Sequence, residues 1–309
     1  MGAYLVRRLL TSILTLWVII TLTFVLMHAI PGDPFISEAR VSPQALDNLR
    51  RFYGLDQPLP VQYVRYLANL ARLDLGRSIR SEVRNINQMI ADGLPISALL
   101  GAEALILAVV GGVTLGVLAA LGHNRLLDHV SIGLAIVGIS VPSFILATLL
   151  ITIFAVKLGI LPVSTWGTWQ HTVMPAFALG LAPLAYLARL TRSSMLEELG
   201  QDYVKAAIAR GLSRWRVILG HALRNALLPV VTVLGPITAG ILTGSFIIEN
   251  IFGIPGIGKI FVLSISDRDY PLILSGAVVY SVLLLLTNFL VDAAYGVIDP
   301  RIRVLGKTR

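Results

Sequence analysis

The chain contains no cysteine and few charged residues. Of its 309 residues only 14 % are charged, whereas 56 % are hydrophobic; ordinary soluble domains carry about 25 % charged residues. Without cysteine the chain has no disulfide, no thiolate metal ligand and no cysteine nucleophile. So few charges cannot cover the surface of a soluble protein of this size, and the composition therefore predicts a membrane protein.

Long apolar runs take the place of the missing charge. A helix needs about 20 mostly apolar residues to cross the hydrocarbon core of a bilayer. The stretches that meet or approach this length are Leu9–Ile30, Ala98–Leu121, Ser131–Val156, Val173–Leu190, Pro229–Ile248 and Leu272–Val297. The sequence thus predicts an all-α membrane protein with six transmembrane helices. The fourth is short and contains Pro175 and Pro183, so we expect a kink there that neighbouring helices compensate.

The first apolar stretch could also be a cleaved signal peptide, because Arg7 and Arg8 precede it. Its apolar run is long for a signal sequence, and His28-Ala29-Ile30-Pro31 is a poor cleavage site. We therefore favour an uncleaved transmembrane helix over residues 1–30.

The distribution of lysine and arginine sets the orientation. With the N-terminus inside, fourteen of the 25 basic residues lie in inner segments and three in short outer loops, and the rest lie in the long loop 31–97. Cytoplasmic loops are enriched in lysine and arginine, whereas long loops are translocated regardless of charge. This predicts cytoplasmic N- and C-termini. The net charge of +8 then reflects topology and does not indicate a nucleic-acid partner.

The outer loop 31–97 is long enough to fold. Ser42-Pro43 is a typical helix start, and residues 61–73 read as an amphipathic helix. Its predicted apolar face consists of Val61, Val64, Leu67, Ala68 and Ala71. Two interpretations remain open: a lid packed over the helix bundle, or a docking surface for an external partner.

The inner loop, about 189–228, reads as two short helices joined at Gly211, because glycine readily adopts the positive φ of a sharp turn. After the turn, Trp215, Ile218, Leu219 and Leu223 form an apolar stripe at helical spacing. On periodicity alone this is a solvated, positively charged loop with an interfacial helix.

Ala206-Ala207-x-x-x-Gly211 resembles the "EAA" loop of ABC importer permeases. Other segments extend the resemblance over about residues 4–303. They are Pro31-Gly32-Asp33-Pro34-Phe35, Tyr53-Gly54-Leu55-Asp56-Gln57-Pro58, Leu73-Asp74-Leu75-Gly76-Arg77-Ser78, His221–Pro229, Glu249–Gly258, Arg268-Asp269-Tyr270-Pro271 and Ile298–Arg303. In this order and spacing the chain looks like a B-type subunit of the dipeptide/oligopeptide/nickel permease family.

This resemblance implies a type I ABC importer permease fold in a bacterial inner membrane. It implies an N-terminal helix over 1–30, a periplasmic loop over 31–97 and a permease core of five helices over 98–303. The residues it implies for coupling to an ATP-binding subunit are Lys205, Ala206, Ala207, Gly211, Leu212 and Arg214. Lys205 stands where the general motif has glutamate, and the spacing from Gly211 to Pro229 is longer than in sugar importers.

The implied machine has five components: an external solute-binding protein, two homologous permease subunits and two ATP-binding subunits. Peptides are the expected solutes, and relatives that carry nickel or glutathione leave those open. No cofactor or metal is expected. Gly253–Lys259 nearly matches a phosphate-binding loop, but Ile260 replaces the required serine or threonine. We therefore expect ATP hydrolysis in partner subunits and none in this chain.

Two rival functions are weaker. An ion-coupled secondary transporter would carry charged residues at midplane or an inverted repeat, and the predicted span centres are nearly uncharged. An intramembrane enzyme would need a nucleophile and base or metal ligands at membrane depth, and the five histidines lie at span ends or in loops. Two acids, Glu103 and Asp292, fall near span ends; Asp292 is the better candidate for a functional intramembrane acid.

Overall fold

The computed structural model describes residues 2–29, 43–80, 85–242 and 246–298, and over these residues the fold is helical, with one isolated β-bridge between Arg77 and Asn85. The first half comprises α1 (Gly2–Ala29), α2 (Pro43–Tyr53), α3 (Leu59–Ala71), α4 (Ile86–Ile106), the π-helix η2 (Leu107–Gly111), α5 (Gly112–Leu121), α6 (Leu126–Ser140), α7 (Ser143–Leu150) and the π-helix η3 (Ile151–Lys157). The second half comprises α8 (Gln170–Leu199), α9 (Asp202–Ala209), α10 (Arg214–Val217), the π-helix η4 (Ile218–Ala222), α11 (Leu223–Ala226), α12 (Leu228–Leu242), α13 (Phe246–Ile251), α14 (Ile257–Ser266) and α15 (Tyr270–Ile298).

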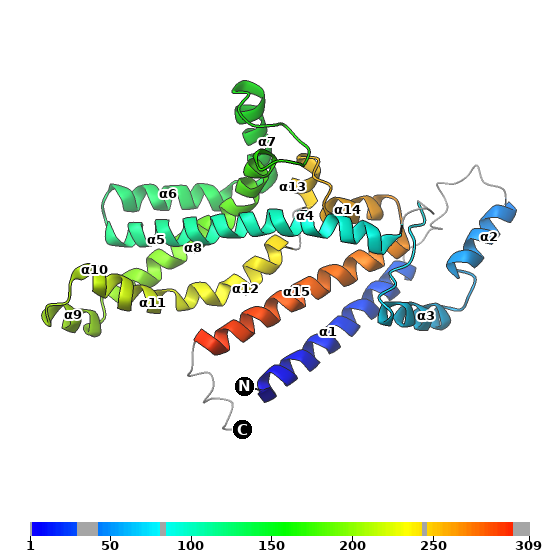
Figure 1. The fold of residues 1–309 in the computed structure, drawn as a ribbon, viewed down its shortest axis with the longest axis horizontal. Coiled ribbons are helices and arrows are strands. Elements are labelled where there is room, and N and C mark those ends of the chain that lie inside the picture. Colours follow the sequence, from blue (N-terminus) through cyan, green and yellow to red (C-terminus); the bar gives the residue numbers. More distant parts are fainter. Residues whose placement is uncertain (1, 30–42, 81–84, 243–245, 299–309) are drawn as a thin grey trace.

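The molecule is elongated, with its long helices running roughly along its length (Figure 1). α4, η2 and α5 form one rod beside α8 and α6, and α12 lies between this group and α15. α1 packs along α15 with opposite chain direction. The short helices α9 and α10 lie at one end and α2 and α3 at the other. We call the end with α9 the inner end, because the charge distribution predicts that it is cytoplasmic.

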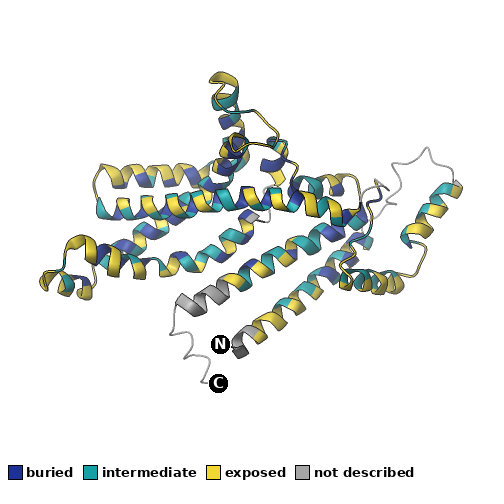
Figure 2. Cartoon of the chain, viewed as in Figure 1, coloured by how far each residue is buried: buried dark blue, intermediate teal, exposed yellow. Residues whose placement is uncertain are grey.

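Within the described residues, four helices are long and apolar enough to cross a membrane, and there are six candidate spans if each of two bent pairs counts as one. Their outward surfaces are largely exposed apolar side chains, most clearly along α1 (Figure 2). A chain that leaves so many leucines and isoleucines uncovered needs lipid or protein around it. The predicted all-α membrane architecture is confirmed.

The tightest helix contact lies between α5 and α8. A Cβ on Gly112 would fall 2.8 Å from the Leu184 carbonyl oxygen, and one on Gly116 would fall 2.6 Å from that of Ala188. Glycines spaced four apart let two helix backbones approach closely in a membrane. These two residues therefore hold the rod against α8.

The stretch predicted as one span over Ser131–Val156 is broken. α6 and the α7–η3 helix meet at an angle of 104°. The break falls at Val141 and Pro142, whose ψ angles of 118° and 139° are extended. Proline has no N–H to continue the helix and disfavours helical geometry in the residue before it. The predicted stretch is therefore sharply bent and forms either one broken span or a re-entrant loop.

Three other boundaries differ from expectation. α4 begins at Ile86, so the end of the loop predicted over 31–97 is helical. α8 is one continuous helix from Gln170 to Leu199 that contains Pro175 and Pro183, and it extends well into the predicted inner loop. The stretch Pro229–Ile248 is divided between α12, which ends at Leu242, and α13, which begins at Phe246.

The predicted packing face of α3 was wrong. Val61 and Val64 are exposed, and Tyr63 and Tyr66 pack against Phe24 of α1 instead. The Tyr63 hydroxyl lies 2.6 Å from Thr21 Oγ1. Aliphatic periodicity missed this face because tyrosine is amphipathic: its ring packs in an apolar cluster while its hydroxyl finds a polar partner.

Candidate functional site

The inner end carries a short helix, α9, that is packed on one side only. Val204 is buried, and Ala207 and Leu212 pack with it against a cluster that includes Met195 of α8 and Val217 of α10. The opposite side of α9 is open. The helix is thus anchored in its own subunit by one face and leaves its other face exposed.

Gly211 ends α9 in a defined cap. Its φ is +84°, its N–H donates to the Ile208 carbonyl at 2.9 Å, and the Leu212 N–H donates to the Ala207 carbonyl at 3.3 Å. This pair of hydrogen bonds is the Schellman motif, in which a left-handed residue satisfies the last carbonyls of a helix. The predicted turn at Gly211 is confirmed, and Leu212 is the apolar residue that accompanies such a cap.

The outer face of α9 is polar at one end and apolar at the other. Lys205 Nζ donates to Asp202 Oδ1 at 3.0 Å, within the same helix. Ala206 and Ile208 are exposed beside this pair. Lys205 therefore makes a local ion pair in this structure and leaves the small Ala206 accessible.

Three polar side chains tie α9 to its neighbours. The Tyr203 hydroxyl donates to Glu198 Oε2 at 2.5 Å, and Asn225 Nδ2 donates to the Tyr203 oxygen at 3.2 Å. Partial burial, followed by the hydrogen bond to Glu198, raises the pKa of Tyr203 above its ordinary value. Since these residues come from α8, α9 and α11, the contact fixes α9 relative to the long helix α8.

The apolar stripe predicted after Gly211 is only partly correct. Ile218 is buried as expected, but Trp215 and Leu219 are exposed and Val217 is buried in their place. The π-helical turn Ile218–Ala222 changes the angular spacing of side chains, so a regular 3.6-residue period assigns the wrong face. Arg214, at the start of α10, is exposed.

A buried ion pair lies behind this inner-end surface. Arg192 of α8 donates to Asp128 of α6 from Nε at 2.5 Å and from a terminal nitrogen at 2.8 Å. The Asn124 N–H and His123 Nδ1 also contact the carboxylate, at 2.9 Å and 3.3 Å. Asp128 is 1 % exposed, so the pair holds the start of α6 against α8.

A second buried carboxylate, Glu249, joins α13 to α4 and α14. Glu249 of α13 accepts a hydrogen bond from Ser97 Oγ of α4 at 2.7 Å and from the Lys259 N–H at 3.1 Å, and the Gly258 N–H also donates to it. Its burial raises its pKa despite these hydrogen bonds. The amides at the start of α14, which form the near match to a phosphate-binding loop, thus hold the chain's own anion.

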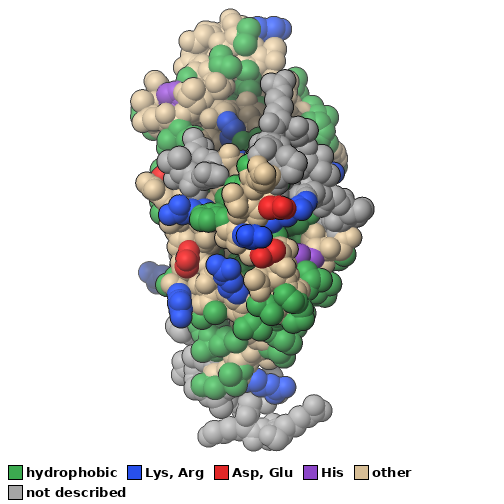
Figure 3. Space-filling view, turned by 90° about the vertical axis from the view of Figure 1, so that its right-hand side faces the viewer, with side chains coloured by type: hydrophobic (Ala, Val, Ile, Leu, Met, Phe, Trp, Pro, Cys, Tyr) green, Lys and Arg blue, Asp and Glu red, His purple; other side chains and the backbone are tan. Residues whose placement is uncertain are grey.

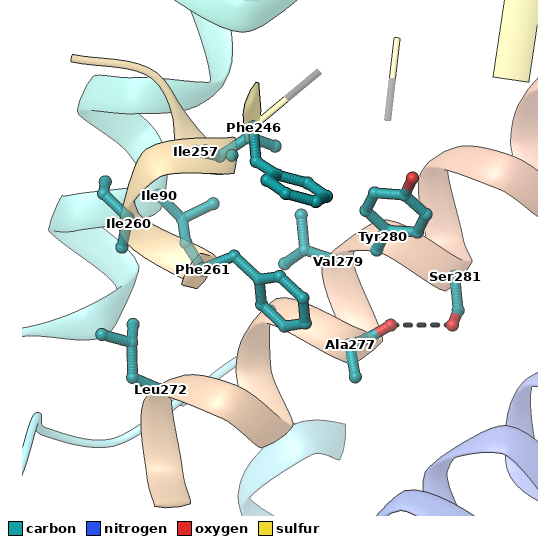
Figure 4. A pocket seen from close by; sticks show the side chains of 12 residues that line it. Ile90, Phe246, Ile257, Ile260, Phe261, Leu272, Ala277, Val279, Tyr280 and Ser281 are labelled. Atoms are coloured by element: carbon teal, nitrogen blue, oxygen red, sulfur yellow. Dashed lines mark hydrogen bonds between the residues drawn. The ribbon is translucent and has the colours of Figure 1, made fainter. Parts of the chain in front are cut away.

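An apolar cavity of about 330 Å³ lies beside this junction, between α4, α13, α14 and α15. Figure 4 shows the rings of Phe246, Phe261 and Tyr280 around it. It contains little that could recognise a polar solute. Within the described residues no group of three or more histidine, aspartate or glutamate side chains is arranged to hold a metal ion.

Of the residues singled out from the sequence, the structure brings Lys205, Ala206, Ala207, Gly211 and Leu212 together on or next to α9. Asp292 falls on α15, but its side chain lies outside the described residues. Sequence reasoning assigned no role to Asp128, Arg192 or Glu249. An acid followed closely by a glycine-rich helix start was the available signal for Glu249.

The comparisons with known proteins agree with this architecture. Residues 112–304 match the family described as binding-protein-dependent transport system inner membrane component, and residues 1–98 match that family's N-terminal region. The chain is 51 % identical over 304 residues to the dipeptide transport system permease protein DppB of Bacillus subtilis (strain 168), covering 98 % of this chain and 99 % of that protein. It is 44 % identical over 302 residues to the oligopeptide transport system permease protein OppB of Escherichia coli (strain K12), covering 97 % and 99 %.

Among solved structures, the inward-facing MetNI methionine ABC transporter is similar with a TM-score of 0.56 and 16 % identity, covering 69 % of this chain and 97 % of that chain. That likeness shows the fold, which is that of an ABC importer permease. The chain belongs to the family of binding-protein-dependent transport system inner membrane components. Its relatives are transport permeases rather than enzymes, and the family as a class works with a partner permease, ATP-binding subunits and a solute-binding protein.

Proposed function

We propose that this chain is a pore-forming permease subunit of an ATP-driven importer for dipeptides or oligopeptides. It forms the path with a second homologous permease, receives solute from an external binding protein, and is driven by two ATP-binding subunits. Support comes from relatives named as peptide permeases that match nearly the whole chain. The observation that carries the mechanism is α9, which is buried on one face and open on the other at the predicted cytoplasmic end.

In this proposal α9 is the coupling helix. Val204, Ala207 and Leu212 seat it against its own subunit, and the Gly211 cap fixes where it ends. The exposed face, with Lys205, Ala206 and the neighbouring Arg214, contacts the ATP-binding subunit. Closure of the ATP-binding subunits would then move α9 together with α8, to which Tyr203 and Glu198 tie it, because a rigid helix pair transmits motion as one body.

ATP is hydrolysed by the partners in this scheme. The amides of Gly258 and Lys259 already donate to Glu249, which supports the expectation that the glycine-rich segment binds no nucleotide. We expect the isolated chain to show no ATPase activity. Turnover by the purified chain alone, beyond that of a mock preparation, would contradict this part of the proposal.

The coupling role has a sharp test because Ala206 is exposed, whereas its neighbour Ala207 is partly buried against its own subunit. Ala206→Glu places charge only on the exposed face and should leave folding intact but reduce ATP-driven uptake of a labelled dipeptide by proteoliposomes containing the complete importer. Ala71→Glu, on exposed α3 at the other end of the molecule, is the matched control. Unchanged uptake and unchanged binding of the ATP-binding subunit in Ala206→Glu would overturn the coupling assignment.

A further inference from the structure

A second cavity lies at the opposite end from α9, where no function has been assigned so far. It has a volume of about 360 Å³, within the range of about 300–1,000 Å³ of small-molecule sites. Its lining comes from α1, α2, α3, the segment 72–79 and the start of α15. We call it the outer cleft. Figure 3 faces this end and shows basic and acidic side chains intermixed across the middle of the surface.

The walls of the outer cleft are aromatic. Phe24 of α1 packs against Tyr63 and Tyr66 of α3, with ring centroids 5.2 Å and 5.9 Å apart. Of these, Phe24 and Tyr66 line the cleft, together with Tyr270 at the start of α15. The Tyr66 hydroxyl is buried and has no hydrogen-bond partner among the described residues. Such walls suit an apolar or aromatic side chain of a ligand.

Two arginines belong to the lining of the cleft. Arg65 and Arg77 both line the cleft, and neither makes an ion pair or side-chain hydrogen bond within the described part of the chain. The Arg65 guanidinium lies over Gly54, close to where a Cβ would be, which fixes the direction of its side chain. A guanidinium group without a partner offers the fork geometry that binds a carboxylate, and the cleft has two such groups in its lining.

One acid completes the set. Asp74 also lines the cleft; its Oδ1 accepts a hydrogen bond from the Gly76 N–H at 2.9 Å, and the other oxygen has no partner among the described residues. His28 and Gln62 are already engaged, since His28 Nε2 lies 3.2 Å from Gln62 Oε1 and Gln62 Nε2 donates to backbone carbonyls. The cleft therefore offers a ligand two cations, one anion, the Tyr66 hydroxyl and aromatic surface.

We propose that the outer cleft binds a short zwitterionic peptide before translocation, with its carboxylate on Arg65 and Arg77, its ammonium group on Asp74 and a side chain against Phe24 and Tyr66. This inference rests on the proposed function, because it takes peptide as the solute. The cleft would give the permease a peptide site of its own, separate from the one on the external binding protein.

The test uses the complete importer in nanodiscs without the binding protein. Equilibrium binding of tritiated alanyl-phenylalanine is measured by scintillation proximity. The double variant R65Q/R77Q should bind at least about tenfold more weakly, a loss of about 1.4 kcal/mol typical of a charge-assisted contact, and R65K/R77K should recover part of this. The matched control is R72Q, since Arg72 is exposed on the same segment but does not line the cleft.

A second arm uses alanyl-phenylalanine amide, which lacks the carboxylate. We expect it to bind wild type as weakly as the free dipeptide binds R65Q/R77Q. The peptide site would be overturned if the two peptides bound wild type equally, or if the dipeptide bound wild type and R65Q/R77Q equally. It would also be overturned if the only defect of R65Q/R77Q were weaker docking of the external binding protein when that protein is added to the nanodiscs. Failure of the proposed function is distinguishable, because it would appear as absent ATP-driven dipeptide uptake while carboxylate-dependent binding persists.

Discussion

Arg192 of α8 donates two hydrogen bonds to Asp128 of α6, at 2.5 Å and 2.8 Å, and Asp128 is 1 % exposed. A buried charge without its partner costs more than the pair contributes when both members are present. Since the Asn124 N–H and His123 still contact the carboxylate when Arg192 is removed, we expect Arg192→Ala to lower the free energy of unfolding by about 1–3 kcal/mol, measured as a shift in thermal unfolding of the purified complex in detergent.

The double variant Asp128→Leu/Arg192→Leu is the control for this prediction. Because it removes both charges together, it should be less damaging than Arg192→Ala alone. If the double variant were the less stable of the two, burial of an unpaired carboxylate could not be the cause.

Two helical glycines give a matched pair for testing the α5–α8 contact. A Cβ on Gly116 would lie 2.5 Å from Thr191 Cβ, whereas one on Gly133 of α6 meets nothing within 4 Å. Gly116→Ala should destabilise by about 1–3 kcal/mol through overpacking, and Gly133→Ala should stabilise by roughly 0.5–1 kcal/mol through its better helix propensity. Denaturant-dependent unfolding checks both; equal effects would show that the close approach does not matter.

The cap at Gly211 predicts a graded loss of coupling. A left-handed φ costs an ordinary residue about 1–2 kcal/mol, and asparagine tolerates it better than alanine. Gly211→Ala should therefore loosen α9 more than Gly211→Asn, seen as faster hydrogen exchange of residues 202–212 and as more ATP hydrolysed per dipeptide imported. Identical exchange rates in the two variants would contradict the role of the positive φ.

Glu249 predicts a pH dependence of stability. Burial raises its folded-state pKa, so folding favours the protonated form. Its stabilising contribution is complete below the unfolded pKa of about 4.3 and is lost as the pH rises through the folded value. The difference in melting temperature between wild type and Glu249→Gln should shift in favour of the variant between pH 4 and pH 8. A pH-independent difference would refute the assignment.

Much of the membrane architecture was predictable because a helix that crosses lipid needs a run of about 20 apolar residues, which few soluble segments contain. The turn at Gly211 was predictable because its conformation favours glycine. The break after Ser140 depended on one proline in an apolar run that hydropathy alone scores as continuous. Side-chain faces failed where geometry is not set by a 3.6-residue period: at the π-turn over Ile218–Ala222, and on α3, where tyrosines replace aliphatic residues at the contact.

Hydrogen bonds between residues far apart in the chain could not be predicted from local sequence patterns. Ser78 Oγ donates to Asp269 Oδ2 at 2.5 Å, and Ser97 donates to Glu249, yet nothing local in either segment identifies its partner. Such contacts depend on how the helices pack together, and local patterns in a single sequence do not reveal that packing. They join the long outer loop and the α13–α14 segment to the helix bundle.

The Glu249 carboxylate also determines whether the start of α14 can bind an anion from outside the chain. Helix N-termini attract anions, and every peptide carries one at its end. Since the Glu249 side chain is 1 % exposed and already accepts hydrogen bonds from the Gly258 and Lys259 amides, the carboxylate of a peptide cannot take up this position. The start of α14 is therefore closed to outside anions by the chain's own side chain.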